Sequence, residues 1–359
     1  MIGRDSRAWV EVDLAAITDN ARTVARIAGV RLLPAVKANA YGLGAVAVSR
    51  ALEALDPWGY VVATLEEGNE LRAGHIERPV VVLMPARADL FDAYHAQRLT
   101  PAIGDPAALR AWVKRGQGPF HLELDTGMGR TGVRWDEIDA CRDALDTPLF
   151  EGAFTQFHSA EVADGSAEQQ QERFETAMKR MPRRPPLVHC ANSAAVMRDR
   201  SGRFVYNLVR PGVFLYGGSP GPGLSEGRQV VSLRARVVSV RRVRAGESVS
   251  YNASWTADQE TTVATLAIGY ADGVPRTLAA GGEAFVLLNG ARCRYAGLVT
   301  MDLTMIETGD APPAIGNVAT LIGMSGDECV TLEQFAGWGE VLQRELLTGL
   351  GSRLPRVYP

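Results

Sequence analysis

The 359-residue chain has few cysteines, few lysines and no long apolar run. Its four cysteines are scattered without a C-x-x-C pair, which argues against a disulfide framework or a structural zinc site. The first residues, MIGRDSRAWVEV, lack the apolar core of a signal peptide, and no segment approaches the length of a membrane-spanning helix. With no H-E-x-x-H motif either, we expect a cytoplasmic protein without a metal ion or a membrane partner.

Positive charge is not in excess, because the formal net charge is -3 at pH 7. The arginine-rich stretch 234–244 alternates with the period of a strand, so we expect a solvated sheet face there rather than a phosphate-binding patch. A nucleic-acid partner is therefore not expected.

Lysine is scarce, with three lysines among 38 lysine and arginine residues. Lys114 and Lys179 lie in polar, helix-like contexts, whereas Lys37 ends a short apolar run and precedes turn-forming residues. Arginine could replace a solvated lysine but cannot form an imine, and a desolvated amine with a depressed pKa can attack a carbonyl. Lys37 is therefore a candidate Schiff-base residue; the alternative is a lysine that only extends from a strand end into solvent.

Short apolar runs alternate with helical patterns along the first part of the chain. The eight runs end at Lys37, Thr64, Met84, Gly104, Asp125, Phe157, Ala191 and Arg210. This alternation predicts an α/β fold, a (β/α)8 TIM-like barrel. A doubly wound open sheet is the alternative, but no G-x-G-x-x-G follows the first strand.

The composition changes after this part. The segment 217–227 is rich in glycine, proline and serine and indicates an interdomain linker. Beyond it, the pattern predicts strands at 230–243, 247–251, 261–268, 283–288, 299–306 and 317–322. We predict a barrel domain, residues 1–227, and a mostly β C-terminal domain, residues 228–359, on which residues 1–10 are expected to pack.

Barrel enzymes assemble their sites at the C-terminal ends of the strands. Polar residues at these positions are Lys37, Tyr41, Arg130, Gln156, His158, His189, Asn192, Ser193 and Arg210. The eighth run continues into PGVFLYG, where small residues and free backbone N–H groups could cradle a phosphate. An imine-forming lysine and a phosphate cradle together suggest pyridoxal phosphate.

Eight stretches carry a resemblance to a known family. They are VKANAYGLG, LDTGMGRTGV, HCANSAA, VRPGVFLYG, SYNASWTA, IGYADGV, TMDLTMI and RLPRVY. In this order and at these separations they resemble the alanine racemase family of pyridoxal-phosphate enzymes, over nearly the whole chain. The resemblance implies interconversion of L- and D-alanine, with D-alanine supplied for peptidoglycan. It also implies a head-to-tail homodimer whose sites combine the barrel of one subunit with the second domain of the other.

The resemblance implies two catalytic bases on opposite faces of the cofactor, Lys37, which also carries it, and Tyr251. Two bases suit racemisation because the proton leaves one face and returns to the other. Arg210 would face the pyridine nitrogen and keep it unprotonated, and His189 would orient Arg210. The other cofactor-binding residues implied are Tyr41, Asn192, Ser193, Gly212 and Val213. The substrate-binding residues implied are Arg130 and, from the partner subunit, Met301 and Asp302.

Three positions depart from the family pattern. Glu123 stands where many members have a carbamylated lysine, Gln156 where many have histidine, and Ser352 where some have a phosphate-binding tyrosine. Glu123 has the negative charge of a carbamate on a shorter side chain, so it is a candidate partner for Arg130. Asp125, on the same face of the strand, is the rival.

Three other functions remain to be weighed. A broad-specificity racemase acting on serine or larger side chains differs only in pocket size, which the sequence does not show. A basic amino-acid decarboxylase shares the barrel and the lysine, but the SYNASWTA and TMD motifs argue against it. A pyridoxal-phosphate-binding protein without turnover would consist of the barrel alone.

Overall fold

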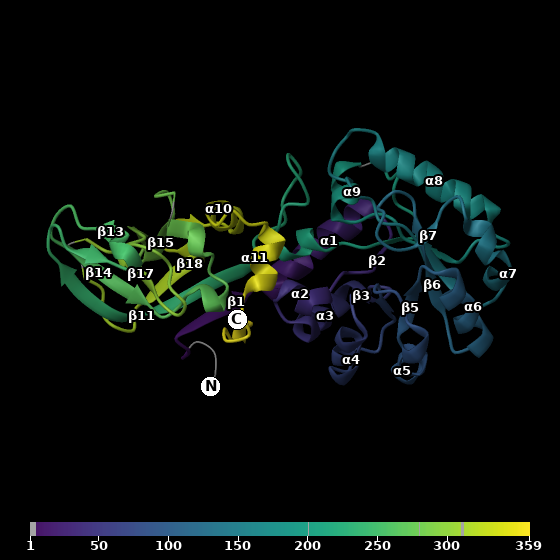
Figure 1. Cartoon of the computed structure of the whole chain (residues 1–359), viewed down its shortest axis with the longest axis horizontal. Coiled ribbons are helices and arrows are strands. Elements are labelled where there is room, and N and C mark those ends of the chain that lie inside the picture. The colour runs from purple at the N-terminus through teal and green to yellow at the C-terminus, as the bar shows by residue number, and fades with distance from the viewer. Residues whose placement is uncertain (1–4, 200, 280, 310–311) are drawn as a thin grey trace.

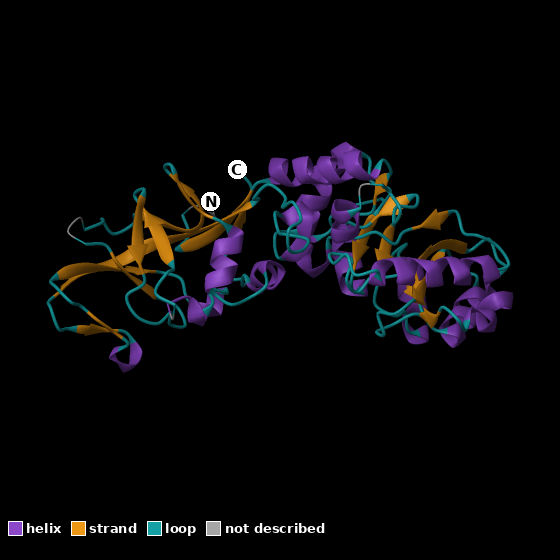
Figure 2. Cartoon of the chain, turned by 90° about the horizontal axis from the view of Figure 1, so that it is seen from above, coloured by secondary structure: helices purple, strands orange, loops and turns teal. Residues whose placement is uncertain are grey.

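The computed structural model describes residues 5–199, 201–279, 281–309 and 312–359. The N-terminal part combines helices with parallel strands, and the C-terminal part consists mostly of antiparallel strands (Figure 1, Figure 2). The two parts lie next to each other along the long axis of the molecule, with strand β1 (Ala8–Val12) and helix α11 (Gln343–Gly349) near their junction (Figure 1). Among the described residues, no helix is both long enough and apolar enough to cross a membrane.

A curled parallel sheet forms the centre of the N-terminal part. Its strands follow the order β3 (Tyr60–Val62), β4 (Val80–Val82), β5 (Thr100–Ile103), β6 (Phe120–Asp125), β8 (Phe150–Phe154) and β9 (Leu187–Val188). The short strand β7 (Val133–Arg134) also pairs with β6. Strands β2 (Arg31–Leu32) and β10 (Leu208–Val209) form a separate parallel pair. Each of the eight apolar runs thus overlaps a parallel strand that is shorter than the run itself.

Two isolated bridges link the pair to the larger sheet. Ala35, just after β2, bridges Val61 of β3, and Asn192, after β9, bridges Arg210, after β10. Both bridges are parallel. Lys37 follows one of these junctions and Arg210 lies within the other, so the two residues emerge at the same end of the sheet.

Helices surround this sheet (Figure 1). They are α1 (Leu14–Ala28), α3 (Ala45–Leu52), α4 (Leu65–Ala73), α5 (Phe91–Ala96), α6 (Pro106–Arg115), α7 (Arg142–Leu145), α8 (Ser166–Arg180) and α9 (Ser193–Arg198). Side-chain caps fix several starts: Asp13 accepts from Ala16 N at α1, and Asp105 precedes Pro106 at α6. Thr64 and Glu67 form a capping box at α4.

Aromatic side chains fill the space between the sheet and the helices. Phe91 and Trp112, from α5 and α6, meet edge to face with ring centroids 4.9 Å apart. Phe120 and Phe150, from the neighbouring strands β6 and β8, stack at 5.5 Å. All four are buried. This packing gives the loops at the strand ends a rigid base.

The C-terminal domain is mostly β, as predicted. The long strand β11 (Val231–Val243) pairs antiparallel with β1, β14 (Thr261–Leu266) and β18 (Val318–Ser325). The remaining strands are β12 (Ser248–Val249), β13 (Trp255–Thr256), β15 (Phe285–Leu288), β16 (Ala291–Arg294), β17 (Thr304–Glu307), β19 (Glu328–Val330) and β20 (Arg356–Val357). Helices α10 (Leu332–Trp338) and α11 pack beside them.

The predicted strand 299–306 is wrong in its first half. Strand β17 begins at Thr304, and the preceding residues form a turn. Thr300 closes this turn, because its backbone N–H donates to Leu303 O at 3.0 Å and its hydroxyl donates to the same oxygen at 2.8 Å. Met301 and Asp302 therefore project from a turn and not from a sheet.

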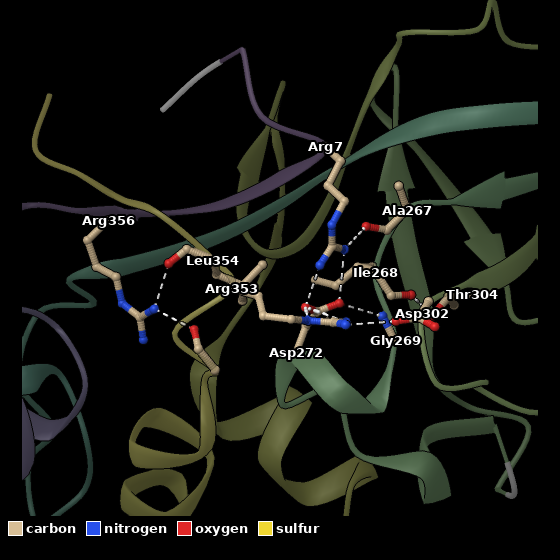
Figure 3. A network of polar contacts seen from close by, with 11 residues as sticks. Arg7, Ala267, Ile268, Gly269, Asp272, Asp302, Thr304, Arg353, Leu354 and Arg356 are labelled. Atoms are coloured by element: carbon tan, nitrogen blue, oxygen red, sulfur yellow. Dashed lines mark hydrogen bonds and ion pairs between the residues drawn. The ribbon is translucent and has the colours of Figure 1, made fainter. Parts of the chain in front are cut away.

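A buried carboxylate joins segments from both ends of the chain to the β domain. Asp272, in η6 (Tyr270–Asp272), accepts hydrogen bonds from Arg7 at 2.7 and 3.0 Å and from Arg353 at 2.9 Å. Figure 3 shows both guanidinium groups directed at this carboxylate. Burial alone would raise the pKa of Asp272, but the hydrogen bonds from Arg7 and Arg353 lower it below its usual range. Arg353 also donates to Asp302 at 2.9 Å, so the network reaches the turn.

We expect Asp272→Asn to destabilise the protein by roughly 2–3 kcal/mol at pH 7, because it leaves charged donors without their anion. The lowered pKa stabilises the fold above pH 3.8, the usual aspartate value, and this contribution is lost as the pH falls below it. Urea unfolding of wild type and variant should therefore differ at pH 7 and converge in acid. Asp258→Asn, at an exposed position, is the control. Equal unfolding midpoints at pH 7 for wild type and Asp272→Asn would contradict the role of the carboxylate.

Candidate active site

Lys37 begins a turn of left-handed helix, α2 (Lys37–Tyr41). The residues with φ between 52° and 55° are Ala38, Asn39, Ala40 and Tyr41. This conformation costs an L residue about 1–2 kcal/mol, so the surroundings must hold the turn in place. Inside it, Gly42 N donates to Ala38 O at 2.7 Å. The side chain of Asn39 links the turn to the start of α3, because its Oδ1 accepts from Ala45 N, also at 2.7 Å.

The environment of Lys37 favours a neutral amine. Burial lowers its pKa, and the positive charges of Arg130 and Arg210 act in the same direction. Glu67 acts in the opposite direction. An amine that loses its proton more easily is a better nucleophile toward a carbonyl carbon. The property hypothesised from the sequence, a desolvated lysine at a strand end, is present at this position.

Arg210 and His189 form a buried pair. Arg210 Nη1 donates to His189 Nδ1 at 2.7 Å, and its Nη2 donates to Thr155 O at 2.8 Å and to Gln156 Oε1 at 3.2 Å. Burial lowers the pKa of Arg210 to about 10, so the guanidinium stays charged at neutral pH. Burial, together with the charge of Arg210, lowers the pKa of His189 well below its usual value. The imidazole is therefore neutral, and its Nδ1 accepts. Gln156, which departs from the family pattern, takes part in holding Arg210.

The residues expected at a phosphate lie together near the N-terminal end of α9. Ser193 Oγ accepts a hydrogen bond from Gly212 N at 2.9 Å, and Asn192 caps the helix by accepting from Ala195 N at 3.0 Å. The hydroxyl of Tyr41 lies so close to Gly212 that a Cβ there would stand 2.6 Å from it. Val213 follows and begins η4 (Val213–Tyr216). Hydroxyl and backbone N–H groups of this kind are donors for phosphate oxygens.

Arg130 is exposed and is not paired directly with either proposed carboxylate among the residues that the structure describes. Glu123 is buried in β6 and accepts from Thr131 Oγ1 at 2.9 Å. Asp125 accepts from Gly127 N at 2.9 Å and Gly129 N at 3.1 Å, so it shapes the loop that leads to Arg130. The hypothesis that Glu123 is the partner of Arg130 thus finds no direct contact; the partner of Glu123 Oε1 is the hydroxyl of Thr131.

The remaining candidates lie in the C-terminal domain. Tyr251, in η5 (Tyr251–Ala253) between β12 and β13, is 69% exposed. Figure 1 places β13 at the far end of the β domain from α2, so one chain does not bring Tyr251 and Lys37 together. Met301, 53% exposed, is held through its carbonyl oxygen, which accepts from Ala271 N at 3.0 Å. Asp302 is held by Arg353 (Figure 3).

Glu67 was missed by the reasoning from sequence. It contacts the backbone immediately after Lys37, with Oε1 accepting from Ala38 N at 2.7 Å. The signal available in the sequence was the capping-box spacing Thr64-x-x-Glu67, which predicts a helix start and says nothing about Lys37.

Comparison with known proteins identifies the family. The family model "Alanine racemase, N-terminal domain" matches residues 12–220, and "Alanine racemase, C-terminal domain" matches residues 230–358. The chain belongs to the alanine racemase family. An alanine racemase from Geobacillus kaustophilus is 38% identical over 369 residues, which cover 98% of this chain and 94% of that protein.

Solved structures of alanine racemases have the same fold. The Bacillus anthracis alanine racemase with bound L-Ala-P has a TM-score of 0.89 and 31% identity, covering 98% of this chain and 95% of that one. The Bartonella henselae alanine racemase with covalently bound pyridoxal phosphate has a TM-score of 0.87 and 28% identity, covering 99% and 100%. The alanine racemase resemblance carried by the eight sequence stretches is confirmed.

The buried charge of Glu123, where many members of the alanine racemase family have a carbamylated lysine, has a testable effect on stability. Burial raises the pKa of Glu123 above 4.5, opposed by the hydrogen bond from Thr131 and the charge of Arg130. A raised pKa means that the charged carboxylate destabilises the fold once the pH exceeds that value. Glu123→Gln keeps an acceptor for Thr131 without the charge, so we expect higher stability than wild type at pH 7 and no gain below pH 4.5.

Urea unfolding at both pH values measures this difference. Glu226→Gln, an exposed glutamate in the loop before β11, is the matched control and should change stability at neither pH. If Glu123→Gln gains the same stability over wild type at both pH values, or gains none, the buried charge of Glu123 does not destabilise the fold.

Proposed function

We propose that this protein is an isomerase, a pyridoxal-phosphate-dependent alanine racemase that interconverts L- and D-alanine. The observation that carries the proposal is its 38% identity to an alanine racemase along 98% of the chain. The β domain with Tyr251 argues against a barrel-only binding protein. We further infer that the enzyme is cytoplasmic and that its D-alanine serves peptidoglycan synthesis.

The residues present fit the cofactor. Lys37 supplies an amine with a lowered pKa, and Ser193 with Tyr41 supplies hydroxyls beside the bare Cα of Gly212. The missing Cβ leaves room for the Tyr41 hydroxyl at this position. Arg210 has donors and no acceptor, so it suits an unprotonated pyridine nitrogen. When bound, pyridoxal phosphate acts as an electron sink for the substrate α-carbon.

We infer that two groups move the Cα proton. Lys37 Nζ takes or returns it on one face, and Tyr251 Oη does so on the other. The lowered pKa of Lys37 supports this role because an amine must be neutral to accept a proton. Arg130 is the cation for the substrate carboxylate, and Met301 and Asp302 complete the substrate end.

The proposal includes a head-to-tail homodimer with shared sites. Tyr251 and Met301 support it, because both are more than half exposed in the single chain. The separation of β13 from α2 in Figure 1 also supports it, since Tyr251 reaches a Lys37 only if that lysine belongs to another subunit.

We also propose that the parallel strands close into a (β/α)8 barrel and that residues 1–227 form the barrel domain. The bridges Ala35–Val61 and Asn192–Arg210 support closure, because they connect the β2–β10 pair to the two ends of the larger parallel sheet, at β3 and after β9. The pairing of β1 with β11 and β20 supports the expected packing of the N-terminal strand on the C-terminal domain, residues 228–359.

A panel of L-amino acids, with D-enantiomer formation followed by chiral chromatography, tests the function. We expect L-alanine to be the preferred substrate of the purified protein supplied with pyridoxal phosphate. Lys37→Ala, the control, should lose at least roughly 100-fold in rate. Faster turnover of serine or larger amino acids would support a broad-specificity racemase instead. A lack of D-alanine formation would refute the proposal.

Tyr251→Phe removes the hydroxyl proposed as the second base while leaving the ring. We expect a loss of roughly two or more orders of magnitude in kcat, with pyridoxal phosphate still bound as judged by absorbance. Tyr206→Phe, which removes a hydroxyl bonded to Glu175 elsewhere on the barrel, is the matched control. Near wild-type turnover of Tyr251→Phe would rule out its assignment.

Mixing Tyr251→Phe with Lys37→Ala protein tests whether sites are shared. After subunit exchange, about half of the dimers are mixed and each has one intact site, so activity should recover to about a quarter of wild type. No recovery, with exchange demonstrated by differently tagged subunits, would argue for sites within single chains.

A further inference from the structure

Glu67 uses its two carboxylate oxygens on two different elements. Oε2 accepts from Ala63 N at 2.6 Å and Thr64 N at 3.3 Å, which completes the capping box of α4. Oε1 accepts from Ala38 N at 2.7 Å. A single side chain therefore ties the start of α4 to the first peptide after Lys37.

The peptide that Glu67 holds is where the left-handed turn begins. Ala38 has φ 52° and ψ 48°, and the next residues, Asn39 and Ala40, repeat this conformation. None of them is glycine, so the conformation is not intrinsic to the sequence. Glu67 holds the first residue of the turn through Ala38 N, and the side chain of Asn39, the second residue, ties the turn to Ala45 N at the start of α3.

Glu67 also lies near the amine itself. Its negative charge raises the pKa of Lys37, whereas the positive charges of Arg130 and Arg210 lower it. The carboxylate is half-buried, whereas its neighbour Glu66 is exposed. The two adjacent glutamates thus have different surroundings, although the sequence alone does not distinguish them.

We propose that Glu67 is a positioning residue for Lys37: by binding the amide of Ala38, it fixes the left-handed turn that directs Lys37 Nζ. Its effect on racemisation rests on the function proposed above. Its effect on the turn does not, because the turn is a property of the chain without cofactor or substrate.

Glu67→Gln separates this role from helix capping. Glutamine has one carbonyl oxygen, so it accepts from Ala38 or from the α4 start but not from both, and its amide group is itself a donor. Capping boxes use glutamine as well as glutamate, so α4 keeps its cap and Ala38 loses its partner. Thr64→Ala is the converse, because it removes the cap hydroxyl and leaves Glu67 on Ala38. Glu66→Gln is the matched control for charge.

Hydrogen exchange of the purified full chain, with and without pyridoxal phosphate, measures how firmly the backbone of the left-handed turn is held. In Glu67→Gln, we expect at least about 10-fold faster exchange in the peptide covering 37–45, with little change in the peptide covering 65–73. Thr64→Ala should show the reverse, and Glu66→Gln should match wild type. Unchanged exchange of 37–45 in Glu67→Gln would overturn the proposal.

Steady-state kinetics of racemisation then test whether the turn positions Lys37. We expect Glu67→Gln to lower kcat at least about 10-fold with KM within about threefold, because a misdirected base slows proton transfer more than it weakens binding. Thr64→Ala and Glu66→Gln should stay within about twofold of wild type. Faster exchange without loss of kcat would also overturn the proposal. If the wild-type protein does not racemise alanine, the proposed function fails. The difference in hydrogen exchange between Glu67→Gln and Thr64→Ala still tests whether Glu67 holds the turn.

Should Glu67→Gln not fold, Glu67→Asp serves in its place. Aspartate keeps the charge and both acceptors, but its shorter side chain cannot span α4 and Ala38 together. The same faster exchange in 37–45 is expected. If the peptides covering 37–45 and 65–73 of the Glu67→Asp variant both exchange at the wild-type rate, the proposal is overturned.

Discussion

The left-handed turn after Lys37 is the constraint on which the candidate site depends. The turn directly follows Lys37, which carries the amine, and ends at Tyr41, whose hydroxyl lies against Gly212. One strained segment therefore sets the distance between the group expected to carry the cofactor and a group expected at its phosphate. Because four consecutive residues adopt a conformation that the unfolded chain avoids, neighbouring elements must stabilise it. Hydrogen bonds from the start of α4 and the start of α3 meet this need.

Burial lowers the pKa of three basic groups of the site, with a different consequence for each. It lowers the pKa of Lys37, which favours the free amine, and that of His189, which becomes an acceptor. It lowers that of Arg210 to about 10, too little to remove the charge at neutral pH. The same dry environment thus provides a base, a neutral acceptor and a permanent cation, because their usual pKa values differ.

Part of this structure could be predicted from the sequence. The eight apolar runs, the change to β structure and the isolated Lys37 follow from local patterns, and the motifs carry the family. Contacts between distant segments could not be predicted. The turn at Thr300 takes the first half of the run 299–306 that the pattern predicts as a strand, because the carbonyl oxygen of the apolar Leu303 closes the turn. Glu67 and Ala38 are 29 residues apart, and a capping-box pattern does not show that the second carboxylate oxygen has another partner.

Strand β1 has a further consequence for how the protein is made. Its partners are β11 and β20, and Arg7 before it meets Asp272 and, through it, Arg353. During synthesis, β1 emerges first, and its partners emerge only after the whole barrel sequence has been translated. The apolar residues of β1 thus remain without their native neighbours while the barrel folds, and closure of the β domain is a late, long-range event. The ribosome must synthesise the whole barrel sequence before β1 can pair with β11, and nearly all of the described chain before it can pair with β20.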